Sequence, residues 1–119
     1  MEEEIKNWFN QAEKDLSAAE DSFKSRHYEW ACFQAQQSVE KALKSLYIKK
    51  FNELIKTHDL IFLAKKINAS KEIISYCSKM NPSYMDTRYP DLAKNYFEEN
   101  TKEILILAKD IVSWTKNNL

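Results

Sequence analysis

The chain has 119 residues, a length that suits one hydrophobic core and argues for a single domain over residues 1–119. Its 18 basic and 18 acidic residues give zero formal net charge, which predicts weak long-range attraction to nucleic acid or to an anionic membrane. Glycine is absent, which excludes the glycine-rich loops that cradle phosphates. Any phosphate must therefore be bound by a helix N-terminus and by side chains.

The first half of the chain is typical of two long amphipathic helices. Apolar residues recur every three or four positions from Ile5 to Phe23, and again from Tyr28 to Leu46. These stripes predict helices over about residues 3–25 and 28–49. The polar break between them is short, so the two helices should pack antiparallel as a hairpin.

The next stretch predicts two short helices followed by an irregular segment. Thr57 is placed to cap a short third helix, and Ser70 is placed to cap a fourth. Pro82 and Pro90 disfavour helix at the residue before each of them. We therefore expect one long irregular segment over about residues 81–95.

A final long helix should end the chain. Asn100, followed three residues later by Glu103, resembles a capping box. The helix should begin near residue 97 or 101 and run to about 117. No alternating pattern offers a strand, so the expected fold class is all-α.

The N-terminus, the apolar stretches and the cysteines indicate the location of the protein and limit its chemistry. The N-terminal residues resemble no secretory signal, and the longest apolar stretch, Ile104–Ala108, is too short to cross a bilayer. We therefore expect a cytoplasmic protein. Cys32 and Cys77 fall on apolar helix faces and should be buried free thiols. Two scattered cysteines and two scattered histidines have no zinc-site spacing, so we expect no metal and no cofactor.

One face of the second predicted helix is not required for core packing. It consists of six residues at three- and four-residue spacing: Trp30, Gln34, Gln37, Lys41, Lys44 and Ile48. The face is either an ordinary solvated surface or a surface for a partner or ligand, and the pattern leaves both interpretations open. In the second case Lys41 and Lys44 can form a positive rim.

His58 and the irregular segment hold the other candidate binding residues. His58 follows the expected Thr57 cap, where backbone N–H groups favour an anion, although a capping or packing role is the alternative. The guanidinium of Arg88 can bind a phosphate with two hydrogen bonds, or it can form a structural ion pair with a nearby carboxylate. Two tyrosines and an aspartate near Arg88 can stack on a base and contact a ribose: Tyr84, Tyr89 and Asp91.

These candidate residues lie within three stretches whose order and spacing resemble a known family. The stretches are Ala31–Lys44 (ACFQAQQSVEKALK), Thr57-His58-Asp59-Leu60, and Tyr84 with Thr87-Arg88-Tyr89-Pro90-Asp91. With Asp15-Leu16 and Ala18-Ala19 the similarity covers nearly the whole chain. The chain resembles the HEPN family (higher eukaryotes and prokaryotes nucleotide-binding).

The resemblance implies a fold, an assembly and a partner. The fold would be an up-and-down bundle of four main helices plus a short helix, commonly assembled as a homodimer. Such domains are often encoded beside a minimal nucleotidyltransferase, in pairs that resemble toxin–antitoxin systems. They are associated with nucleotide or RNA metabolism.

The chain departs from the family members that are metal-independent RNases. Those enzymes carry an arginine followed four to six residues later by a histidine, whereas here His27 follows Arg26 directly and no histidine follows Arg88. The leading hypothesis is therefore a module that binds a nucleotide or a nucleic-acid phosphate and cooperates with a nucleotidyltransferase. The alternatives are an RNase toxin that uses His58 and Arg88, and a dimeric helical scaffold without a small ligand.

Overall fold

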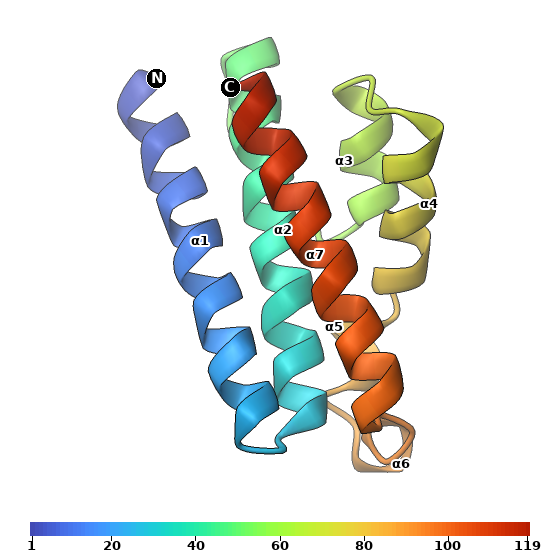
Figure 1. Ribbon diagram of the computed structural model, residues 1–119. Coiled ribbons are helices and arrows are strands. Elements are labelled where there is room, and N and C mark those ends of the chain that lie inside the picture. Colours follow the sequence, from blue (N-terminus) through green and yellow to red (C-terminus); the bar gives the residue numbers. More distant parts are fainter.

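Three long helices form the frame of the molecule in the computed structural model, which describes all 119 residues (Figure 1). They are α1 (Glu2–Lys24), α2 (Tyr28–Phe51) and α7 (Glu98–Asn118). Two shorter helices, α3 (Leu60–Lys66) and α4 (Lys71–Met80), and two single turns, α5 (Ser83–Asp86) and α6 (Pro90–Ala93), complete the chain. No strand is present, so the expected all-α helical bundle is confirmed.

The helix α2 is the centre of the bundle. Figure 1 shows α1 beside it in the opposite direction, α7 packed against both, and α3 and α4 on the other side. Buried residues occupy most positions of α2 from Ala31 to Ile48, and polar side chains are among them. The expected α1–α2 hairpin is confirmed, and the side chains buried around α2 include the polar groups of the candidate site.

The core is formed by the apolar stripes that the helical period predicted. Ala12 and Ala19 of α1 are completely buried, and their small side chains let α1 approach α2 closely. Leu43 of α2, Leu63 of α3 and Ile111 of α7 are also fully buried and belong to the core between these helices. The helices therefore depend on one another, because the apolar stripe of each helix is buried only where a neighbouring helix packs against it.

The chain makes its left-handed turns without glycine. Three residues have positive φ angles: Arg26 (62°), Asn52 (54°) and Asn68 (58°). Asparagine tolerates this region better than most residues, because its short polar side chain can hydrogen-bond to the local backbone. Asn52 ends α2, and the segment from Asn52 to Asp59 then returns along α2 to the start of α3.

Two of the three predicted helix caps are wrong. Asp59 caps α3, because its carboxylate accepts hydrogen bonds from the N–H groups of Ile61 and Phe62. The hydroxyl of Thr57 accepts from the N–H of Asp59 at 3.2 Å instead. Ser70 caps α4 as expected.

The last helix begins close to the predicted residue 97, but its cap differs from the prediction. Phe97 is the residue that precedes α7, and Asn100 lies within its first turn. The Asn100 amide oxygen accepts from the N–H of Phe97 at 2.7 Å, which is the half of a capping box that reaches backwards. Phenylalanine has no side-chain acceptor for the other half, so helix α7 begins without a side-chain cap at its first position.

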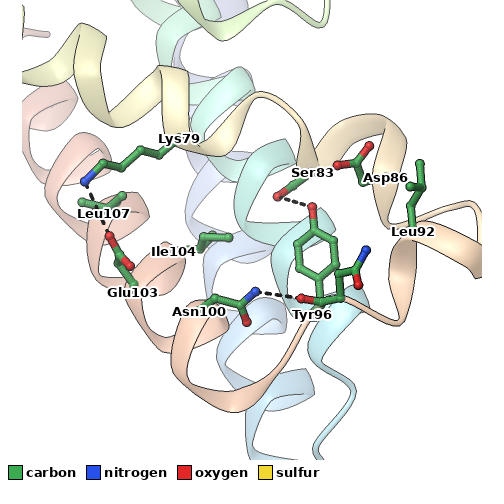
Figure 2. Close-up of a pocket in the computed structure, with 10 residues that line it drawn as sticks. Lys79, Ser83, Asp86, Leu92, Tyr96, Asn100, Glu103, Ile104 and Leu107 are labelled. Atoms are coloured by element: carbon green, nitrogen blue, oxygen red, sulfur yellow. Dashed lines mark hydrogen bonds and ion pairs between the residues drawn. The ribbon is translucent and has the colours of Figure 1, made fainter.

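A pocket of about 380 Å³ lies between α7 and the segment that joins α4 to α7 (Figure 2). The Tyr96 hydroxyl lies 3.3 Å from the hydroxyl of buried Ser83, and burial raises the pKa of Tyr96, so the phenol stays protonated. The Lys79 ammonium lies 3.6 Å from the Glu103 carboxylate across the pocket. The first contact joins α5 to the segment before α7, and the second joins α4 to α7.

The two cysteines are free and buried, as the sequence predicted. Desolvation by burial raises the pKa of Cys32 to about 11 and the pKa of Cys77 to about 12. Both side chains therefore stay as uncharged thiols and pack as small apolar groups.

None of the helices is long and apolar enough to span a membrane.

Candidate functional site

The middle of the additional face of α2, from Gln34 to Lys44, turns toward α1, whereas Trp30 at its start is 51% exposed. The Lys41 ammonium lies 2.5 Å from a carboxylate oxygen of Asp15, and the Ser22 hydroxyl donates to Gln34 at 2.6 Å. The Lys44 ammonium lies 5.3 Å from the ring centre of Trp8. The middle of this face therefore forms a polar seam between α1 and α2, which is neither the solvated surface nor the ligand surface that the spacing left open.

A buried ion pair joins this seam to residues 52–59, which we call the return segment. The side chains of Lys44 and Glu40 are only 7% and 4% exposed, and their charged atoms lie 3.0 Å apart. The other carboxylate oxygen of Glu40 lies 3.0 Å from Nδ1 of His58. Fully buried Gln36 donates to the backbone oxygen of His58 at 3.3 Å. Glu40 and Gln36 together dock His58 on the middle of α2.

Tyr84 of α5 brings His58 and Arg88 together. The rings of Tyr84 and His58 stack with centres 4.0 Å apart and an angle of 15° between their planes. The guanidinium carbon of Arg88 lies 4.2 Å from the centre of the same tyrosine ring. Two groups at these distances cannot share one face of the ring, so His58 and Arg88 cover opposite faces. We call these three residues the His58–Tyr84–Arg88 stack.

The terminal nitrogens of Arg88 have no acceptor within the chain. Its Nε donates to the backbone oxygen of Tyr84 at 2.8 Å, and its guanidinium also lies 5.9 Å from the ring centre of Phe33. No carboxylate forms an ion pair with it, although Glu40, Asp86 and Asp91 lie near it in the fold or in the sequence. The guanidinium is thus oriented by aromatic rings and keeps its outer donors unused, an arrangement that suits an anion.

The other expected site residues do not join the stack. Tyr89 is exposed and precedes α6, and the exposed side chain of Asp91 has no hydrogen bond or ion pair. The ammonium groups of Lys41 and Lys44 are already paired with carboxylates, so neither lysine is free to form the expected positive rim.

The N-terminus of α3 is not available to a phosphate, contrary to our expectation. Its free N–H groups are satisfied by the Asp59 carboxylate, which also accepts from the Asn81 amide at 2.9 Å. Asn81 in turn accepts from the N–H of Leu60 at 2.8 Å. The hydrogen bond from Asn81 and those from the first turn of α3 hold the pKa of Asp59 below its usual value. A negative charge of the chain itself therefore occupies this position.

Replacing Asp59 with alanine is expected to lower the free energy of unfolding by about 0.5–2 kcal/mol at pH 7, the usual cost of losing a helix cap. Because the pKa of Asp59 is lower in the folded state, its contribution is complete above about pH 4 and disappears as the pH falls through the folded-state value. Urea unfolding at pH 7 and pH 3 should show the difference from wild type narrowing in acid. Asp59→Asn keeps a capping oxygen and serves as the control, and a constant difference down to pH 3 would contradict the assignment.

Sequence reasoning missed that Glu40, Gln36 and Phe33 organise the site, and it missed the burial of Lys44. Glu40 and Lys44 are four residues apart on a helix, which is the spacing of many exposed surface pairs, so nothing in the pattern indicates burial. Gln36 and Phe33 are ordinary members of the helix α2 run. Their roles depend on segments that are distant in sequence, such as the return segment that carries His58.

Comparisons with known proteins agree with the helical architecture. A model of the HEPN domain matches residues 5–119. A structure from Thermus thermophilus is 28% identical, with a TM-score of 0.89 over 97% of this chain and 98% of that one. An archaeal HEPN homologue is also 28% identical, with a TM-score of 0.82 over 96% of each chain.

A more distant solved structure shares the fold. It is a HEPN domain protein from Thermotoga maritima that is 16% identical, with a TM-score of 0.76 over 93% of this chain and 95% of that one. No curated protein matches the chain.

Proposed function

The chain belongs to the HEPN domain family, and from this membership and the site geometry we propose that it is a module that binds a nucleotide or a nucleic-acid phosphate. The proposal rests on one observation, the unpaired terminal nitrogens of Arg88. Its guanidinium is held against Tyr84, and its outer nitrogens have no acceptor in the chain. A phosphate oxygen is the acceptor whose charge and geometry suit such a fork of donors.

His58 adds a second polar group to the proposed site. Its side chain is 53% exposed, and the buried Glu40 carboxylate accepts from Nδ1 at 3.0 Å, which leaves Nε2 free for a ligand. Because Tyr84 lies between the two side chains, His58 and Arg88 serve different groups of a ligand. We assign the phosphate to Arg88, whereas His58 presents Nε2 on the opposite face of the Tyr84 ring.

Calorimetric titration with adenosine monophosphate tests the proposal. We expect wild type to bind the nucleotide, and we expect Arg88→Ala to weaken binding at least about tenfold, because a charge-assisted pair is lost. The variant should lose no more than about 1 kcal/mol of stability, since the side chain is exposed. If wild type binds no nucleotide at millimolar concentration, the proposal fails and the scaffold hypothesis replaces it.

A metal-independent RNase is the second candidate, and the contact between Glu40 and His58 favours it. A carboxylate that orients imidazole is a common arrangement for proton transfer. However, the Tyr84 ring separates His58 from Arg88, whereas the reaction needs both at one phosphate. We therefore expect no robust RNA cleavage by the purified protein. Cleavage that is lost in both His58→Ala and Arg88→Ala would instead establish the enzyme.

The proposal includes a homodimer and a small nucleotidyltransferase partner, and both rest on the family resemblance. Trp114 is only partly buried against the core and Trp30 is 51% exposed, so one chain fully buries neither side chain. Light scattering should give twice the 14.1 kDa of one chain. A nucleotidyltransferase encoded beside this chain should co-purify with it when the two are expressed together.

A further inference from the structure

An open pocket of about 640 Å³ lies beside Arg88, on the side of the stack that faces α6. Its walls come from the first turn of α2, the end of α5 and the turn around α6. Seven residues line it: Glu29, Trp30, Thr87, Arg88, Pro90, Ala93 and Lys94. The volume falls within the range of pockets that hold compact organic ligands of nucleotide size.

An exposed aromatic side chain and two cationic side chains line this pocket. Trp30 is 51% exposed, and its ring is fixed edge-on against Phe33 with centres 6.2 Å apart. Arg88 and Lys94 are cations that form no ion pair with the chain. An exposed indole beside two unpaired cations offers a flat apolar surface and a positive region within a single pocket.

We propose that this pocket recognises a nucleoside monophosphate, with the base stacked on Trp30 and the phosphate bound by Arg88 and Lys94. This inference rests on the proposed function, and it adds the class of ligand and the position of the base. Stacking on an indole selects for an aromatic base, whereas arginine and lysine alone accept any phosphate. Glu29 lies in the same pocket and can accept a hydrogen bond from an amino group of the base or from a ribose hydroxyl.

Affinities for adenosine monophosphate and ribose 5-phosphate, measured by calorimetry, test the inference. We expect wild type to bind the nucleotide about tenfold more tightly than the sugar phosphate, because only the nucleotide stacks. Trp30→Ala should remove this preference and leave ribose 5-phosphate binding unchanged, and Trp30→Phe should keep part of it. Lys94→Ala should weaken both ligands by a similar factor.

Phe62→Ala is a matched control, since Phe62 is an exposed aromatic residue with a lysine ammonium 5.5 Å from its ring centre, but on α3. It should change neither affinity. Equal wild-type affinity for the two ligands, or a Trp30→Ala variant that keeps its preference, would overturn the inference while leaving phosphate binding intact. Absence of binding to both ligands would overturn the proposed function itself. Binding of the dinucleotide ApA with higher affinity than the monophosphate would identify an RNA end as the source of the ligand.

Discussion

Replacing Glu40 with alanine is expected to lower the free energy of unfolding by about 3–5 kcal/mol, the usual cost of breaking a buried ion pair from one side. The Lys44 side chain is 7% exposed, so its ammonium would keep a charge with little access to water. The Trp8 ring nearby offers only a weak substitute for the carboxylate. The same substitution also removes the acceptor of His58 Nδ1 and loosens the return segment. Chemical denaturation of wild type and variant measures the difference.

The chain offers a matched control for this prediction. Glu20 and Lys109 also lie 3.0 Å apart, but their side chains are 37% and 56% exposed. Glu20→Ala should therefore cost at most about 1 kcal/mol. A double variant with Glu40→Leu and Lys44→Met should recover most of the lost stability, because it removes both buried charges. If Glu40→Ala costs no more than Glu20→Ala, the pair is not buried in solution as it is here.

The long helices could be predicted because their signal is local. Apolar residues from Ile5 to Phe23 and from Tyr28 to Leu46 repeat with the helical period, and packing of those stripes produces the observed hairpin. The start of α3 was harder to predict, because Thr57 and Asp59 are both good capping residues only two positions apart. The choice between them depends on Asn81, which binds both Asp59 and the N–H of Leu60.

The candidate site could be predicted only in part. The family resemblance indicated His58, Tyr84 and Arg88, and the structure places these three in contact. Their arrangement was not predictable, because the position of Tyr84 depends on how the proline-bounded segment folds back against α2. The expected role of Lys44 required an exposed ammonium, and helical spacing alone does not reveal that α1 covers it.

Tyr84→Ala is expected to disturb both the fold and the proposed site, because the ring contacts three other groups. It stacks on His58, carries the Arg88 guanidinium and lies 6.2 Å from the ring centre of Phe33. Loss of these contacts from a half-buried position should cost about 2–4 kcal/mol of stability. Arg88 would also become free to rotate, and ordering it again on binding should weaken adenosine monophosphate binding about three- to tenfold.

Tyr84→Phe separates the ring from the hydroxyl. The Tyr84 hydroxyl takes part in no hydrogen bond, whereas the ring makes every contact of the stack. We therefore expect Tyr84→Phe to match wild type in both thermal unfolding and calorimetry. Binding that survives in Tyr84→Ala at the wild-type level would show that Arg88 needs no aromatic support to hold a phosphate. Binding that is lost in Tyr84→Phe would show that the hydroxyl itself contacts the ligand, a role that the stack does not require.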